Sequence, residues 1–217
     1  MLISARLSPS NRRFEGRTMA DVIRERSGPG NPTSDPLDVL FDLLIEEGGS
    51  VSTIYAHHTE EDMNRAMIQP WCSFGSDGSA LAIEGPLRAG NPHPRSFGTF
   101  PRVLGVYVRE RGVLRLEDAV RKMTSLNASR IGTPDRGLLR PGHCADIAIF
   151  DPSRVIDKAT YLEPFQYNRG IEFVLVNGTI VLRNGEVTNQ RPGRVLRNGK
   201  VAERQAPGKP SGPANAP

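Results

Sequence analysis

The spacing of apolar and polar positions predicts a mixed α/β chain. Residues 51–56 and 71–74 form short apolar runs with the composition of strands. Helices are expected around them, because Thr18 with Asp21 and Thr59 with Asp62 have the spacing of a capping box. Strands that alternate with helices through short connections are typical of parallel α/β units. Two such units are predicted in this part of the chain.

Three further helices follow from caps and periodicity. One is predicted to begin at Asp35, with Pro36 at its first position, and to end at the Gly48-Gly49 pair. After a long loop from Gly75 a helical stretch is expected to reach Arg111, and a clearer helix is expected over residues 116–131. The apolar faces are predicted to be Leu37, Leu40, Phe41 and Leu44 in the first of these, and Leu116, Ala119, Val120, Met123 and Leu126 in the last.

The pattern changes at about residue 133. Residues 146–150 and 173–182 are rich in β-forming side chains, and Asn177-Gly178 and Asn184-Gly185 have the composition of two-residue hairpin turns. The sequence therefore predicts three parts: an α/β part over 1–133, a small antiparallel β module over 134–189, and a basic tail rich in Pro and Gly over 190–217. The tail has too few large apolar residues to fold and is expected to be largely disordered.

Composition and charge are those of a water-soluble globular protein. Apolar residues make up 37% and charged residues 24%, and no apolar run has the length of a membrane span or of a signal peptide. A cytoplasmic protein is therefore expected. The net charge of +4 comes from the tail, where six cations face one anion, so residues 1–189 carry −1. This distribution argues against a nucleic-acid-binding module, which would need a basic surface on the folded part.

The candidate chemistry lies at the end of the predicted strand over 71–74. Asp77 follows this strand, and the carboxyl ends of parallel barrel strands are where catalytic groups converge. Arg95 comes later in the same Gly-rich loop, and Arg88 is an alternative cation there. Ser-Asp-Gly is also a common turn, so a purely structural role for Asp77 competes with a catalytic one.

The two cysteines do not suggest a cross-link or a metal. Cys72 and Cys144 are far apart in dissimilar segments, and both are expected to be buried thiols, with Cys72 inside a strand. Gly98 and Gly105 are expected to serve the backbone conformation.

Four motifs in this chain resemble a known family. They are Gly75-Ser76-Asp77-Gly78, His93-Pro94-Arg95 with residues 98–105, residues 121–128, and residues 142–147 with Val176-Asn177-Gly178. Together they resemble the C-terminal part of the N-acyl-D-amino-acid deacylases of the amidohydrolase superfamily. The first two motifs are the specific ones, whereas the last is shared by amidohydrolases in general.

The resemblance implies a fold and an activity. The fold would be a (β/α)₈ barrel with a small β-sandwich, of which this chain would supply the last barrel units and C-terminal sandwich strands. The activity would be hydrolysis of an N-acyl-D-amino acid by a zinc-bound water. Asp77 would then be the general base and a possible zinc ligand, Arg95 would hold the substrate carboxylate, and Ser76 and Gly78 would line the substrate site.

The family's other zinc ligands fall outside the matching region. The four histidines are His57, His58, His93 and His143, and none forms the expected His-x-His. Catalytic zinc takes about three protein ligands, so this chain alone is predicted neither to hold zinc stably nor to be active. His57 and His58 are expected to be polar residues at a strand end, and His93 to stabilise its own loop.

Two alternatives remain open. The chain could be a non-catalytic or split-subunit partner that associates with a complementary amidohydrolase chain, such as an N-terminal half, or with itself. Related barrel chemistries, such as those of dihydroorotase-like and hydantoinase-like enzymes, share the same fold. The expected partner of the leading hypothesis is a small N-acyl-D-amino acid, with no nucleic acid and no membrane.

Overall fold

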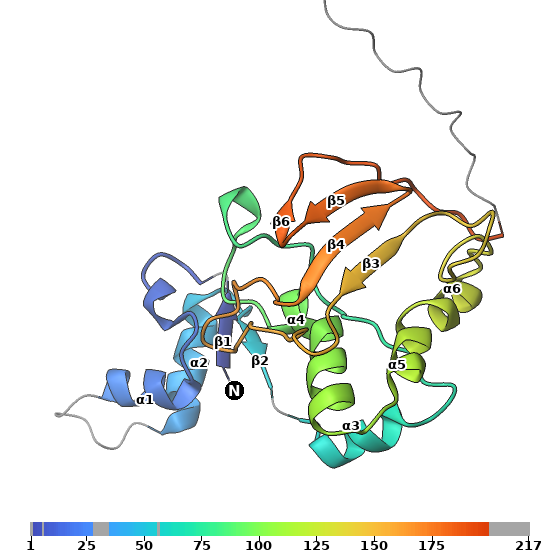
Figure 1. Ribbon diagram of the computed structural model, residues 1–217. Coiled ribbons are helices and arrows are strands. Elements are labelled where there is room, and N and C mark those ends of the chain that lie inside the picture. The colour runs from blue at the N-terminus through green and yellow to red at the C-terminus, as the bar shows by residue number, and fades with distance from the viewer. Residues whose placement is uncertain (1, 6, 28–34, 56, 200–217) are drawn as a thin grey trace, which may run out of the picture.

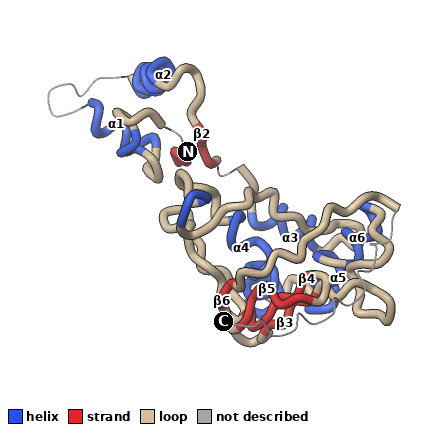
Figure 2. The backbone as a smooth tube through the Cα atoms, turned by 90° about the horizontal axis from the view of Figure 1, so that it is seen from above, coloured by secondary structure: helices blue, strands red, loops and turns tan. Residues whose placement is uncertain are grey.

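A computed structural model describes residues 2–5, 7–27, 35–55 and 57–199 (Figure 1). Seen from above, the helices α1 and α2 lie at one end of the molecule and the larger sheet lies toward the other (Figure 2). Each part has its own apolar cluster. No described helix combines the length and the apolar character needed to cross a bilayer. The predicted disorder of the tail falls mostly on residues 200–217, outside the described residues.

The N-terminal part is a two-stranded antiparallel ribbon with two helices. Strand β1 (Leu2–Ala5) pairs with β2 (Ser52–Ile54), with Ile3 opposite Thr53. Between them lie the short 3₁₀ helix η1 (Arg12–Phe14), α1 (Met19–Ser27) and α2 (Pro36–Glu46). The cluster that they enclose consists of Ile3, Leu7, Phe14, Val22, Val39 and Leu43.

The caps predicted from sequence are confirmed. Thr18 Oγ1 accepts a hydrogen bond from the amide of Asp21 at 3.2 Å, and the Asp21 carboxylate accepts one from the Thr18 amide at 3.0 Å. Asp35 caps α2 by accepting from the Leu37 amide at 2.8 Å, and Pro36 is the first helical residue. Thr59 caps α3 (Glu60–Met67) in the same way. Each cap satisfies an N–H that the first helical turn leaves without a backbone partner.

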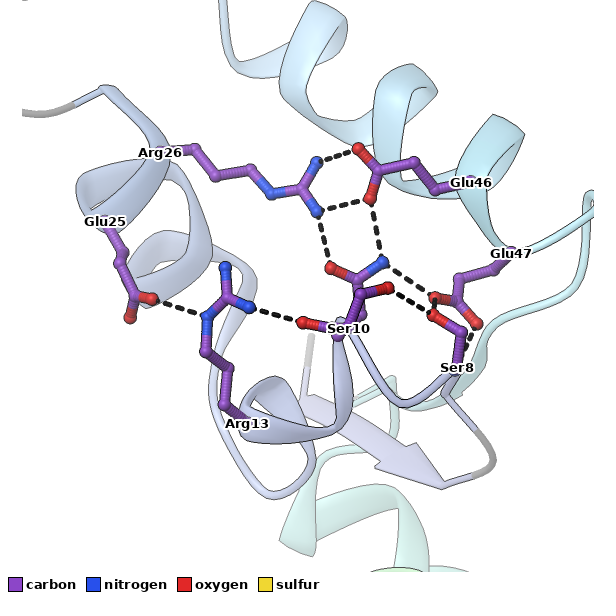
Figure 3. Close-up of polar contacts among 8 residues, drawn as sticks. Ser8, Ser10, Arg13, Glu25, Arg26, Glu46 and Glu47 are labelled. Atoms are coloured by element: carbon purple, nitrogen blue, oxygen red, sulfur yellow. Dashed lines mark hydrogen bonds and ion pairs between the residues drawn. The ribbon is translucent and has the colours of Figure 1, made fainter.

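A polar network fastens the N-terminal loop to both helices (Figure 3). Its centre is the buried Asn11, whose Nδ2 donates to Glu46 at 2.8 Å and to Glu47 at 2.7 Å. Arg26 of α1 binds the Glu46 carboxylate at 2.6 Å and donates to Asn11 Oδ1 at 2.9 Å. Ser8 donates through both its amide and its hydroxyl to Glu47. The network therefore links the end of α2 to α1 and to the loop after β1.

The predicted apolar face of α2 is wrong. Val39 and Leu43 are the buried residues of this helix, whereas Leu37 and Phe41 are 57% and 56% exposed. The helix carries apolar side chains on most of its circumference, so periodicity alone does not select a face. The face that packs is the one that α1 and Phe14 cover in the tertiary structure.

The middle of the chain is helical. It contains α3, the short 3₁₀ helix η2 (Gly85–Leu87), α4 (Arg95–Arg102), the π-helical segment η3 (Val103–Glu110), α5 (Leu116–Met123) and α6 (Ser125–Ile131). The single helix expected over 116–131 is broken at Thr124, which has φ −128° and ψ −90°. The cluster here joins Met67 of α3, Val103, Leu104, Val106 and Tyr107 of η3, Leu114, Ala119 of α5, and Val155.

The parallel strand pairing predicted for these residues is not seen in the described part of the chain. Strand β2 pairs antiparallel with β1, and all strand pairs within the described part of the chain are antiparallel. The strand predicted over 71–74 is a turn followed by a segment without regular secondary structure and without ladder pairing. Its backbone groups are bound by side chains of α5 and α6, which a local β propensity does not reveal.

The last part is a four-stranded antiparallel sheet in the order β3-β4-β5-β6. The strands are β3 (Ile147–Phe150), β4 (Ile171–Val176), β5 (Thr179–Arg183) and β6 (Glu186–Val187). Both predicted hairpins are confirmed. Asn177 and Gly178 have φ +49° and +80°, and Asn184 and Gly185 have φ +52° and +82°, as tight hairpin turns require. Gly105 of η3 packs closely on Val155 and Ile156, which joins the helical part to the segment after β3.

Candidate active site

Asp77 and Arg95 are brought into direct contact. Arg95 Nη2 lies 2.8 Å from Asp77 Oδ2, and the side chains are 45% and 86% exposed. Asp77 lies in the loop after Phe74 and has a left-handed backbone with φ +46°, which Asp tolerates better than most residues. Arg95 is the first residue of α4. The sequence motifs that carry these two residues therefore meet at one exposed point of the structure.

Gly78 is the reason that the loop can approach α4. A Cβ atom on Gly78 would lie 2.8 Å from Ser96 Cα and 3.3 Å from the Arg95 carbonyl oxygen, closer than a side chain allows. Ser76 Oγ accepts a hydrogen bond from the Gly78 amide at 3.2 Å and so shapes the same turn. Both residues lie beside the Asp77–Arg95 pair, and the substrate contacts predicted for them remain predictions.

His93 organises the N-terminus of α4, as the sequence predicted. Its Nδ1 accepts a hydrogen bond from the Arg95 amide at 3.0 Å, and its Nε2 lies 3.3 Å from the hydroxyl of Tyr161. Burial and the neighbouring Arg95 guanidinium lower the pKa of His93. The neutral ring is therefore favoured, and it is the neutral ring that can accept at Nδ1.

Comparison with known proteins then decides the family. Residues 56–182 match the family model described as the amidohydrolase family, which is more than half of the chain. The chain belongs to the amidohydrolase family. The matched segment contains both Asp77 and Arg95.

The similar amidohydrolases are deacylases of D-amino acids. The chain is 36% identical to the N-acyl-D-aspartate deacylase of Alcaligenes xylosoxydans xylosoxydans over 193 residues, which cover 86% of this chain and 37% of that protein. It is 41% identical to the D-aminoacylase of the same organism over 183 residues, which cover 84% of this chain and 34% of that protein.

Solved structures give the same result. A crystal structure of D-aminoacylase superposes with a TM-score of 0.75 at 35% identity, covering 90% of this chain and 37% of that one. The N-acyl-D-glutamate deacylase of Bordetella bronchiseptica, complexed with zinc and a phosphonate inhibitor, gives a TM-score of 0.69 at 34% identity, covering 92% and 36%. The chain thus spans little more than a third of the length of each of these amidohydrolases.

The other residues considered for the site lie apart from Asp77 or have other partners. His57 and His58 are exposed after β2, with their rings 4.0 Å apart, and His143 lies in the loop before β3. Arg88 stacks on the Phe165 ring at 4.0 Å and lines an open cavity of about 620 Å³ that also contains Arg12. Of Arg95 and Arg88, the two arginines predicted to hold a substrate carboxylate, Arg95 is the one that contacts Asp77.

Zinc is not accommodated by the described residues alone. Within residues 2–5, 7–27, 35–55 and 57–199, no three side chains of His, Cys, Asp or Glu come together as a metal site. Asp77 is the single candidate ligand of the amidohydrolase motif, and Arg95 already binds its Oδ2. A catalytic zinc site takes about three protein ligands, so no chemical step is assigned to zinc on these residues.

The cysteines are free thiols, but neither is fully buried as predicted, and Cys72 does not lie in a strand. It is half-buried in the loop after α3. Cys144 Sγ lies 3.3 Å from Asp135 Oδ2, and burial together with this contact raises the pKa of the Cys144 thiol. Neither thiol belongs to the candidate site.

The residue that the sequence analysis missed is Lys122 of α5. Its side chain is 1% exposed, and it binds the chain just before Asp77. The available signal was its position three residues after the core residue Ala119, which places a cation on the buried face of an amphipathic helix.

Proposed function

We propose that this chain carries the proton-transfer and carboxylate-binding groups of an N-acyl-D-amino-acid deacylase. The observation that carries the proposal is the contact of Asp77 with Arg95 on an exposed surface, within a segment that matches the amidohydrolase family. The named relatives act on N-acyl-D-aspartate and N-acyl-D-glutamate or are D-aminoacylases, which supports this substrate class.

Each residue has a defined task in this proposal. The guanidinium of Arg95 binds the α-carboxylate of the substrate, since a planar fork of N–H donors matches a carboxylate. Asp77 takes a proton from the attacking water and returns it to the amine that leaves. Ser76 and Gly78 keep the loop against α4 during this exchange.

The finer fold assignment belongs to the same proposal. Within residues 1–133, the helical part from α3 to α6 corresponds to the last units of a (β/α)₈ barrel, and the ribbon β1–β2 with α1 and α2 is an antiparallel addition to it. Residues 134–189, with the sheet β3-β4-β5-β6, correspond to the C-terminal strands of a small β-sandwich. Zinc is the proposed cofactor of the complete enzyme, with its ligands mainly from residues other than those described.

A second candidate function is association with a complementary amidohydrolase chain. It is favoured by two exposed apolar residues in the unpaired segment before Asp77, of which Ile68 is 55% and Trp71 is 66% exposed. Exposed large apolar residues are a feature of protein interfaces. This candidate predicts a stable complex even where no turnover is found.

The experiment supplies the missing part of the enzyme in trans. The 217-residue chain is assayed with zinc on N-acetyl-D-amino acids, alone and together with the N-terminal portion of the Alcaligenes D-aminoacylase that it does not match. We expect no turnover by the chain alone and turnover by the complex. Asp77→Asn is expected to lower kcat by about 10²–10⁴-fold, the usual contribution of a general base.

Arg95→Lys separates binding from chemistry. It is expected to raise KM by about tenfold, because Lys keeps the charge but not the two-pronged geometry. Arg88→Lys is the matched control and should leave KM unchanged. The proposal is rejected if the complex is active and Asp77→Asn retains its rate, or if the complex hydrolyses no N-acyl-D-amino acid.

A further inference from the structure

The segment that leads to Asp77 is held in an unusual way. Residues 68–74 connect α3 to the Gly75-Ser76-Asp77-Gly78 loop and make no strand ladder with the described residues. Several of their carbonyl groups accept hydrogen bonds from side chains of α5 and α6, about 50 positions later in the chain. Figure 1 shows α5 and α6 beside the loop that follows α3.

Lys122 makes the largest number of these contacts. Its Nζ donates to the carbonyl of Met67 at 2.7 Å, to that of Cys72 at 3.1 Å, and to that of Gln69. An ammonium group has three N–H donors, so all of them are used. These carbonyl groups satisfy the polar end of a residue that is 1% exposed. The same three bonds fix both ends of residues 67–72.

Three further side chains of α5 and α6 bind the part of the segment that lies closer to Asp77. Arg121 donates to the Pro70 carbonyl at 2.8 Å, and Arg130 binds the Trp71 carbonyl and, at 3.1 Å, the Ser73 hydroxyl. Asn127 Nδ2 donates to the Phe74 carbonyl at 2.8 Å.

The backbone of Lys122 also binds this segment. Its carbonyl accepts from the Phe74 amide at 3.1 Å, while its ammonium donates to Cys72. Lys122 therefore binds the segment through both its backbone and its side chain. The last residue held in this way is Phe74, and two residues, Gly75 and Ser76, separate it from Asp77.

We infer that Lys122 is a positioning residue, which fixes the segment before Asp77 and thereby holds the Asp77 carboxylate against Arg95. The expected effect on catalysis rests on the proposed function. The expected effect on the position of the Asp77 loop does not. Arg95 is placed independently by α4 and His93. Loss of Lys122 should therefore displace Asp77 and leave Arg95 where it is.

The first measurement is hydrogen–deuterium exchange of the full chain. Lys122→Met fills nearly the same space but leaves three carbonyls without their donor. We expect the amides of residues 72–78 to exchange about tenfold faster or more, with little change in the strands β3, β4 and β5. Lys158→Met is the matched control, because the described residues accept no hydrogen bond from Lys158. It should exchange like the unaltered chain.

A milder variant covers the case in which Lys122→Met does not fold. Asn127→Ala removes only the contact to the Phe74 carbonyl, and we expect a smaller acceleration confined to residues 74–78. Unchanged exchange in this loop in folded Lys122→Met overturns the inference, as does unchanged exchange in Asn127→Ala where Lys122→Met does not fold. A uniform acceleration over the whole chain in Lys122→Met, with none in Asn127→Ala, also overturns it, because it shows a role in general stability alone.

The second measurement uses the complex with the D-aminoacylase portion. Lys122→Met is expected to lower kcat about 100-fold with a KM change below about threefold, because the base moves and the carboxylate anchor does not. An equal loss in both parameters contradicts a positioning role. If the complex is inactive but exchange in the loop still responds, the deacylase proposal fails while the positioning of Asp77 by Lys122 stands.

Discussion

Arg95 Nη2 lies 2.8 Å from Asp77 Oδ2, and both side chains are open to solvent. The contact joins two segments that a long loop separates, and it exists because Gly78 allows the backbone to approach Ser96. An exposed ion pair adds little to stability because water screens it and two side chains must be ordered. A pair of this kind can exchange one partner for a substrate carboxylate at small cost.

The first prediction separates the charge of Asp77 from the shape of its loop. Asp77→Asn should change the free energy of unfolding by less than about 1 kcal/mol, because the pair is exposed and Asn also tolerates a left-handed backbone. Gly78→Ala should lower it by about 1–3 kcal/mol, because the new Cβ meets Ser96 Cα. Urea denaturation measures both. Gly75→Ala is the control, since nothing lies within 4 Å of its Cβ position.

The second prediction concerns the pH dependence of the α4 N-terminus. The lowered pKa of His93 means that, just below the ordinary value of about 6.5, the folded state binds fewer protons than the unfolded chain. Stability should therefore fall as the pH drops through this range and level off below the folded pKa. The measurement is the free energy of unfolding between pH 5 and 7.5.

Two variants test the assignment to His93. His93→Asn keeps an acceptor for the Arg95 amide but cannot titrate, so it should lose most of this pH dependence. His58→Asn alters an exposed ring and should behave like the unaltered chain. Equal pH dependence in all three proteins would assign the effect to another group.

The third prediction concerns the polar network around Asn11. Arg26 and then Asn11 lower the pKa of Glu46, and Ser8 and then Asn11 lower the pKa of Glu47. These depressed values contribute stability above the ordinary Glu pKa of about 4.5, and the contribution is lost as the pH falls through the folded values. After correction for the slower intrinsic exchange at lower pH, the amides of α1 and α2 should therefore lose protection as the pH falls below about 4.5.

Glu46→Gln provides the matching test at neutral pH. It removes the charge that Arg26 binds, so exchange in α1 and α2 should already be faster there than in the unaltered chain. Glu61→Gln, in an exposed pair with Arg65 on α3, is the control and should not affect these two helices. Protection that does not change with acid in the unaltered chain would contradict the role given to the network.

The fourth prediction concerns the thiol of Cys144. Burial and then the hydrogen bond to Asp135 raise its pKa, so alkylation should reach half of its maximal rate above the usual thiol value of about 8.5. Asp135→Asn should shift this midpoint downward, because the neutral amide no longer favours the protonated thiol. The reaction with iodoacetamide is followed by mass spectrometry in a Cys72→Ser background. A midpoint at or below the usual value would refute the assigned environment.

The sequence by itself determined those features that depend on neighbouring residues. The caps at Thr18, Asp35 and Thr59 and the turns at Asn177-Gly178 and Asn184-Gly185 follow from local hydrogen bonding and from backbone conformations that few residues adopt. The family is also determined at this level, since the motifs around Asp77 and Arg95 lie within the matched segment.

Only the tertiary structure decided the features that depend on distant partners. The apolar run over 71–74 has strand composition, but donors from Lys122, Asn127 and Arg130 bind its backbone in place of a neighbouring strand. The buried face of α2 depends on which side α1 covers, because apolar residues occupy most of its surface. The contact of Asp77 with Arg95 depends on how the intervening loop closes. Composition and periodicity report on a residue's local preferences, whereas these outcomes depend on which distant groups satisfy its backbone and cover its side chain.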